Sequence, residues 1–171
     1  MFNFFKKNSK DSNKEAKLVA PITGKTIDLS KVPDKVFAEK MAGDGLAIDT
    51  TGDTVVSPAD GTLTLVFNTK HAFAITLDNG AELLVHIGID TVSLNGEGFE
   101  QLAKAGTKVK AGTPIIKIDR DFILGKGFSL ITPVLVTNMD IIKDLNSNID
   151  KEVVAGEDEV ITFTLYRLLN N

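Results

Sequence analysis

The chain has 171 residues, of which 43% are hydrophobic and 25% charged, and a formal net charge of −4 at neutral pH. This size and composition predict a single globular domain with one substantial core. The absence of cysteine excludes disulfides, thiolate zinc sites and a thiol nucleophile. No segment approaches the roughly 20 apolar residues of a membrane span. No signal-peptide core is visible either, so a cytoplasmic location is expected.

The N-terminal residues differ in charge from the rest of the chain. Residues 1–5 (MFNFF) are apolar, and residues 6–17 carry five lysines against Asp11 and Glu15, a local charge of +3. Residues 1–17 are therefore predicted to be a flexible tail, and residues 18–171 the single domain. A weak contact of residues 1–5 with an anionic membrane surface is one interpretation of this tail, and a frayed terminus is the simpler one.

Subtracting that +3 from the total of −4 leaves −7 on residues 18–171. An acidic body argues against nucleic acid as a partner and suits a protein with a basic face.

From Leu18 onward, short apolar runs alternate with turn signals. The expected strands are Leu46–Asp49, Thr62–Phe67, His71–Leu77, Ala81–Ile89, Pro114–Asp119, Pro133–Thr137 and Val160–Leu165. Short helices are expected over Gly98–Ala105 and Met139–Leu145. This pattern predicts an all-β fold, an antiparallel β-sandwich or barrel with short helices.

Two segments repeat a short pattern. LVAPITG at Leu18–Gly24 and VVSPADG at Val55–Gly61 each place an apolar pair before a proline, with a glycine three residues later. VKAGTP at Val109–Pro114 is a turn of related composition. The repeat suggests pseudo-symmetric, hybrid-motif character, as in biotin and lipoyl carriers, although Pro-x-x-Gly also recurs by chance.

The only two histidines flank a predicted hairpin. Asn79-Gly80 between them is the strongest short-range hairpin signal. With a two-residue loop there, His71 lies opposite Gly88, and both histidines project from one face as diagonal neighbours. A three-residue loop would place them on opposite faces. The favoured expectation is a site built from two imidazoles.

Three interpretations of such a pair stay open on residue chemistry alone. Two imidazoles supply half of a four-ligand zinc site. One imidazole can instead act as a nucleophile while its neighbour steadies the developing charge. Both can also be ordinary polar residues on a sheet.

A longer set of motifs carries a resemblance. LVHIGIDTV at Leu84–Val92, followed by LNGEGF, resembles the phosphorylation-site motif of the glucose-type enzyme IIA family of the bacterial phosphoenolpyruvate:sugar phosphotransferase system. Other short motifs resemble that family in the same order: VPDKVFAEK at Val32–Lys40, GDG at Gly43–Gly45, PADG at Pro58–Gly61, NTKHAF at Asn68–Phe73, and TPV and TNMD within Thr132–Asp140. The resemblance runs from about Leu18 to Leu145.

The resemblance implies a cytoplasmic β-sandwich that takes a phosphoryl group from the phosphocarrier HPr and passes it to a cysteine of a sugar-permease IIB domain. His86 looks like the phosphorylated histidine, His71 like its hydrogen-bonding partner, and Thr69 like the hydroxyl that fixes a histidine tautomer. The residues that look like the partner-binding surface are an acidic pair and an apolar ring: Asp34 and Asp90, with Val36, Phe37, Met41, Phe67, Leu84 and Val92.

Two functions outside that family are the alternatives. One is a biotinyl or lipoyl carrier with Lys40 as acceptor, and the other a lysostaphin-type zinc hydrolase, which needs a third protein ligand. No obligatory cofactor is expected. Within the family, the unphosphorylated protein is a candidate regulator of permeases or kinases. In such a complex, a partner carboxylate would complete a zinc site with His71 and His86.

Overall fold

A computed structural model, which describes residues 14–167, shows fourteen strands in three antiparallel sheets over that range. The large sheet has the order β13 (Glu152–Val153), β2 (Gly24–Ile27), β3 (Asp44–Thr50), β11 (Thr132–Val136), β7 (Glu82–His86), β6 (Ala72–Thr76), β5 (Gly61–Val66) and β9 (Lys108–Val109). The two small sheets are β4 (Thr54–Val56), β10 (Pro114–Ile118), β8 (Phe99–Gln101), and β1 (Ala16–Val19), β14 (Glu159–Leu165), β12 (Ile142–Ser147).

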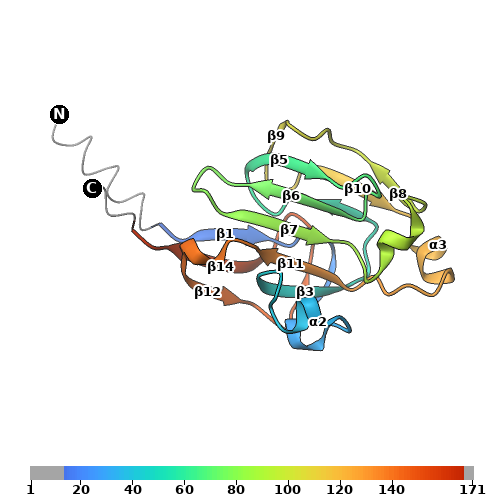
Figure 1. Ribbon diagram of the computed structural model, residues 1–171, viewed down its shortest axis with the longest axis horizontal. Helices are drawn as coiled ribbons and strands as arrows, with labels where there is room; N and C mark the ends of the chain where they lie inside the picture. The colour runs from blue at the N-terminus through green and yellow to red at the C-terminus, as the bar shows by residue number, and fades with distance from the viewer. Residues whose placement is uncertain (1–13, 168–171) are drawn as a thin grey trace.

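The sheets confirm the predicted antiparallel sandwich and exclude the barrel. The large sheet ends in the edge strands β13 and β9 and does not close. The main core contains buried side chains from all three sheets, such as Phe73, Ile116 and Phe163. Figure 1 shows α2 (Lys35–Ala38) beside β3 and α3 (Arg120–Gly125) at one end of the molecule.

A second, smaller core lies on the other face of the large sheet. Its buried members are Leu29, Val32, Phe37, Ala47, Ile89 and Leu135. Side chains alternate along β11, so Leu135 joins this cluster while Val134 and Val136 join the main core. The segment that covers this face contains the 3-10 turn η1 (Leu29–Lys31) and α2, and it brings Phe37 toward the end of β7.

The repeated segments are paired with each other, which confirms the pseudo-symmetry. Val19 N donates to the Pro58 carbonyl at 2.9 Å, and Val56 N donates to the Pro21 carbonyl at 2.7 Å. Each repeat thus gives the other the same hydrogen bond.

The turn at Gly112 also has a symmetric counterpart, in the VVAG segment that ends at Gly156. Gly112 N donates to the Ser57 carbonyl, and Gly156 N donates to the equivalent Ala20 carbonyl, each at 2.8 Å. Gly112 and Gly156 have φ values of 90° and 77°, which favour glycine, and a Cβ on Gly156 would also approach the Gly112 Cα at 3.3 Å.

Both predicted helices are wrong. Gly98–Ala105 instead contains β8, which pairs with β10, and Met139–Leu145 contains one 3-10 turn, η3 (Met139–Ile141), followed by β12. Their apolar spacing fits either structure, and the sheet partners supplied by the rest of the chain decide between them. The actual helices α2 and α3 begin where the Asp34 and Asp119 side chains accept from backbone N–H groups.

The N-terminal boundary also differs slightly. Strand β1 starts at Ala16, two residues inside the predicted tail, because Ala16–Val19 pairs with β14. Residues 1–13, including the proposed membrane-contacting residues 1–5, lie outside the described residues. Within residues 14–167, no helix is both long and apolar enough to span a bilayer.

Candidate functional site

The hairpin that carries the histidines has a three-residue loop, so the predicted two-residue loop is wrong. Strands β6 and β7 pair from Ala72↔His86 to Thr76↔Glu82, and Leu77 N donates to the Ala81 carbonyl at 2.9 Å. Gly80 has a φ of 93°, whereas Asn79 is not among the residues with positive φ, which excludes a type I′ turn. As a result His71 does not lie opposite Gly88.

Strand alternation alone would now separate the two histidines. His71 precedes β6, however, and follows Lys70, whose φ of 57° turns the chain before the strand begins. The His71 carbonyl still accepts from Ile87 N at 2.6 Å, while its side chain turns toward His86. The two imidazole centroids are 4.9 Å apart, with ring planes at 83°. The two-imidazole site therefore exists, although the parity argument for it was wrong.

A backbone carbonyl orients His86. Its Nδ1 lies 2.8 Å from the Gly88 carbonyl oxygen. A carbonyl only accepts, so Nδ1 carries the proton and Nε2 carries the lone pair. Gly88 has a φ of 78°, and a Cβ there would lie 2.6 Å from Thr91 Cγ2 and 2.7 Å from the Ser129 carbonyl oxygen. Glycine is thus required at this position both by conformation and by space.

A side-chain hydroxyl orients His71. Thr69 Oγ1 lies 2.7 Å from His71 Nδ1, and the His71 side chain is almost fully buried. Burial, and then the neighbouring His86, lower the pKa of His71 to about 4. Burial also lowers the pKa of His86, while the Gly88 carbonyl, Asp34 and Asp90 oppose that shift. Both imidazoles are therefore neutral at pH 7.

Two phenylalanines flank the imidazole pair. The Phe37 and His86 ring centroids are 4.9 Å apart, and those of Phe67 and His71 are 5.3 Å apart in an edge arrangement. Phe67 is exposed, but Phe37 is only 5% exposed and belongs to the smaller core. Phe37 therefore adds little exposed surface to the predicted docking ring, and its aromatic ring supports His86 from the side.

The remaining predicted partner-binding residues differ in exposure. Val36, Met41 and Val92 are exposed, and Leu84 packs partly buried against the smaller core. Asp34 also accepts from Val36 N at 2.9 Å. Asp90 is exposed at the turn after β7, with a φ of 59°. Two negative side chains, Asp34 and Asp90, thus act electrostatically on His86, and exposed apolar side chains follow each of them in the sequence.

Sequence reasoning missed two residues that shape the loop after His86. Thr91 is fully buried, and its hydroxyl donates to the Ile87 carbonyl at 2.6 Å. Ile89 N donates to the Ser129 carbonyl at 3.1 Å. Thr91 stood within the recognised motif, whereas nothing in the sequence points from Ser129 to this loop, because its contact uses only backbone atoms.

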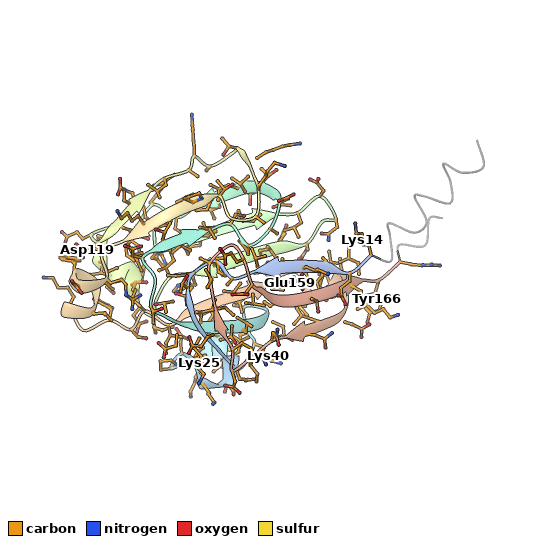
Figure 2. The ribbon with its side chains drawn as sticks, turned by 180° about the vertical axis from the view of Figure 1, so that it is seen from behind. Lys14, Lys25, Lys40, Asp119, Glu159 and Tyr166 are labelled. Carbon is orange, nitrogen blue, oxygen red and sulfur yellow. The ribbon has the colours of Figure 1, made fainter. Side chains whose placement is uncertain are left out.

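The structure adds no third ligand to the two imidazoles. Among residues 14–167, no group of three or more histidine, cysteine or carboxylate side chains is placed to hold a metal ion. Lys40, the candidate cofactor acceptor, has its ammonium 3.4 Å from the Asp44 carboxylate. Figure 2 shows Lys40 and Lys25 on the side of the molecule away from the strands β5 and β9.

Comparison with known proteins gives the family. A family model described as "phosphoenolpyruvate-dependent sugar phosphotransferase system, EIIA 1" matches residues 16–142. The chain belongs to this EIIA family. The glucose-specific EIIA component of the phosphotransferase system of Staphylococcus epidermidis is 42% identical over 165 residues, which are 96% of this chain and 99% of that protein.

Other EIIA proteins agree with this assignment. The N-acetylglucosamine-specific EIICBA component of Klebsiella pneumoniae is 49% identical over 140 residues, 82% of this chain and 22% of that longer protein. The solved structure of glucose permease IIA from Mycoplasma capricolum superposes with a TM-score of 0.80 at 37% identity, covering 88% of this chain and 96% of that one. Family membership decides against the carrier-module and zinc-hydrolase alternatives. The chain is an EIIA component of a sugar phosphotransferase system.

Proposed function

We propose that this EIIA component accepts a phosphoryl group from HPr on His86 Nε2 and passes it to a cysteine of a sugar-permease IIB domain. The observation that carries the proposal is the His86 Nδ1 bond to the Gly88 carbonyl at 2.8 Å, which leaves Nε2 as the nucleophile. Glucose is the first sugar to test, since the Staphylococcus epidermidis relative is named glucose-specific. The proposed location is the cytoplasm.

In the acceptance step, the His86 Nε2 lone pair forms a bond to phosphorus. The bond between phosphorus and the donor atom of HPr breaks, and its electron pair stays on that donor atom. In the onward step, the thiolate of the IIB cysteine attacks phosphorus and the electron pair of the N–P bond returns to Nε2. Most of the catalysis in such transfers is positioning and charge stabilisation, and the fixed tautomer supplies the positioning.

His71 supplies the charge stabilisation in this scheme. If Thr69 donates its hydroxyl proton to His71 Nδ1, then His71 Nε2 carries a proton and can donate to a phosphoryl oxygen on His86. The lowered pKa of His71 keeps it a neutral donor at pH 7. This geometry supports a role for His71 as a hydrogen-bond donor to the phosphoryl group rather than as a second phosphoryl acceptor.

The surface around the pair supports a protein partner with a basic face. Asp34 and Asp90 are close enough to His86 to oppose the lowering of its pKa by burial, and exposed apolar side chains lie beside them in the sequence. Apolar anchors with a charged rim are the usual composition of a transient protein interface. The EIICBA relative carries an EIIA-like part within a longer protein whose name also contains B and C, which supports a IIB domain as the acceptor.

The test is reconstitution with phosphoenolpyruvate, enzyme I and HPr. We expect one acid-labile phosphoryl group on the wild-type chain, seen by intact mass, and none on His86→Ala. The matched control is His71→Ala, which should still be labelled. Acid-labile labelling of His86→Ala would contradict the proposal.

Regulatory binding to permeases or kinases would use the same surface in the unphosphorylated state. A zinc ion at such an interface would take His71 and His86 as two ligands and needs a partner carboxylate. Zinc binding that appears only when the partner is present would support this arrangement.

A further inference from the structure

The peptide group between Gly88 and Ile89 connects His86 to a distant part of the chain. Its carbonyl accepts from His86 Nδ1 at 2.8 Å, and its N–H donates to the Ser129 carbonyl at 3.1 Å. Hydrogen bonds in series polarise one another, so an amide whose N–H is engaged has a stronger acceptor carbonyl. The Ser129 carbonyl therefore acts on the His86 ring through a single peptide group.

Two buried hydroxyls hold the segment that contains Ser129. Thr50 Oγ1 donates to the Leu130 carbonyl at 3.0 Å, and Thr132 Oγ1 donates to the same oxygen at 3.1 Å. Ile131 N donates to Ser129 Oγ at 3.2 Å. Thr50 is the last residue of β3, so this strand sets the position of the segment that faces the His86 loop.

The Arg120 side chain in turn orders Thr50. One guanidinium nitrogen, Nη1, donates to Thr50 Oγ1 and to the Gly52 carbonyl, each at 2.9 Å, and Nη2 donates to the Thr50 carbonyl at 2.8 Å. A guanidinium only donates, so the Thr50 hydroxyl accepts from it and directs its own proton to the Leu130 carbonyl. Bonds from a charged donor are the stronger ones in such a chain.

Arg120 opens α3, which begins directly after Asp119. Figure 2 places Asp119 at the end of the molecule opposite Lys14 and Tyr166. The guanidinium thus joins this end of the molecule to the turn after β3, and its three bonds are all to Thr50 or Gly52. This path reaches His86 at Nδ1, through the Gly88 carbonyl, and not at the Nε2 atom proposed to accept the phosphoryl group, so its effect on transfer is indirect.

We propose that Arg120 and Thr50 are positioning residues for the phosphoryl acceptor. Through the Leu130 and Ser129 carbonyls they fix the Gly88–Ile89 peptide, and that peptide holds His86 with Nδ1 protonated and Nε2 free. The consequence for phosphotransfer rests on the proposed function, in which Nε2 is the acceptor. The consequence for the His86 tautomer is independent of the proposed function.

The experiment compares Thr50→Val, which removes the hydroxyl at nearly constant shape, with Thr50→Ser, which keeps it. The matched control is Thr26→Val, because Thr26 is also fully buried, but its hydroxyl bonds to the Asn148 carbonyl at 2.6 Å and to Lys151 N at 3.0 Å rather than to the Leu130 carbonyl. The first readout is the pair of His86 imidazole ¹⁵N shifts, recorded above the titration range of both histidines. The second is the rate of phosphoryl acceptance from HPr.

Thr50→Val should raise the share of the tautomer with the proton on Nε2 and slow acceptance by about three- to tenfold, the usual worth of one hydrogen bond. Thr50→Ser and Thr26→Val should leave the ¹⁵N shifts of His86 at their wild-type values. Arg120→Met, at a half-buried position, should give the same direction of change, and combined with Thr50→Val it should add little, because both act through one chain.

Wild-type ¹⁵N shifts and acceptance rates in both Thr50→Val and Arg120→Met would overturn the inference. If Thr50→Val does not fold, Arg120→Met alone decides it by the same two readouts. A tautomer change in a protein that is never phosphorylated on His86 would support the positioning chain and reject the proposed function. Normal labelling of His86 with unchanged ¹⁵N shifts in the Thr50 and Arg120 variants would support the proposed function and reject the positioning chain.

Discussion

The two ends of the imidazole pair are held by different kinds of group. His71 lies before β6, is almost fully buried, and is oriented by the side chain of Thr69. His86 lies at the end of β7, is half-buried, and is oriented by the backbone carbonyl of Gly88. A hydroxyl can donate or accept, whereas a carbonyl only accepts.

This difference matches the two proposed roles. The acceptor needs one tautomer at all times, and a backbone acceptor enforces it without depending on any neighbour's protonation state. His71 must donate a hydrogen bond to a phosphoryl group that is present only part of the time. Its partner, the Thr69 hydroxyl, can donate or accept, so the tautomer of His71 can change. If the two ends differ in this way, substitutions at the His86 end and at the His71 end should change different steps and different tautomers.

Gly88→Ala should be the most damaging change at the His86 end. The new Cβ would meet Thr91 Cγ2 at 2.6 Å and the Ser129 carbonyl oxygen at 2.7 Å, so the Gly88 carbonyl must move. Misplacing a reacting group by about 1 Å can cost a hundredfold in rate, and we expect a loss of that order in acceptance from HPr. Gly106→Ala is the control, since Gly106 has a similar φ of 89° with nothing within 4 Å. Equal losses in the two variants would show that backbone strain, rather than the His86 carbonyl partner, is responsible.

The His71 end should be visible in the pH dependence of stability. The pKa of His71 is about 4 in the folded chain, against 6.5 for an ordinary histidine. The unfolded state therefore binds more protons between these values, and stability falls as pH drops from about 6.5 toward 4. The difference of about 2.5 between these pKa values corresponds to an upper limit of roughly 3.4 kcal/mol. Chemical denaturation across this range should show a steeper loss for wild type than for His71→Gln, and parallel curves would contradict the buried neutral state of His71.

His71→Ala should slow the onward step more than the acceptance step. The variant loses a donor to the phosphoryl oxygens, and a hydrogen bond to a charged group is worth roughly 1.5–3 kcal/mol, which is about tenfold or more in rate. Rapid-quench measurement of transfer to a IIB domain, beside acceptance from HPr, separates the two steps. His71→Gln is the partial-retention control. Transfer to the IIB domain at the wild-type rate in His71→Ala would remove the proposed role.

The pairing of the two histidines could be predicted from the sequence, but the hairpin geometry that brings them together could not. Seven strands were expected at nearly their observed positions, because each has five or more residues with a clear apolar pattern. The strands that escaped notice have mostly two to four residues, too few for any periodicity. Strand β12, with six residues, was mistaken for part of a helix, because only its pairing with β14 makes it a strand.

Contacts made through backbone atoms could not be predicted from the sequence, because every residue carries the same backbone groups. The Thr69 and His71 pair could be found because both residues stand within the NTKHAF motif that carries the family resemblance. The Ser129 carbonyl and Arg120 could not, since they reach the His86 loop across long separations through groups that every residue carries. The place of Phe37 in the smaller core could not be predicted for a third reason: an aromatic residue in a short helix gives no sign of which core will bury it.

Thr69→Val tests the adjustable partner directly. Without the hydroxyl, His71 Nδ1 has no orienting group, so we expect mixed tautomers for His71 and a loss of about threefold in transfer to the IIB domain, in the range of one neutral hydrogen bond. The ¹⁵N shifts of His86 should stay unchanged, because its partner is the Gly88 carbonyl. Thr69→Ser, which keeps the hydroxyl, is the matched control. A tautomer change at His86 instead of His71 would show that the two ends are not independently held.

The smallest effect should come from Asp90→Asn, which changes only the charged rim. Asparagine tolerates the φ of 59° at this position, so the turn is preserved while one negative charge is removed. We expect association with HPr to slow by about twofold at low salt and the difference to vanish at higher salt, because exposed charges are screened over about 8–10 Å. Glu152→Gln is the control, since Glu152 lies on the edge strand β13, four strands from β7. At roughly 4.8 Å per strand this is beyond the screening length, so its removal should leave the rate unchanged. Stopped-flow association at several ionic strengths measures both variants, and equal slowing by the two would mean that net charge, rather than a rim around the histidines, attracts the partner.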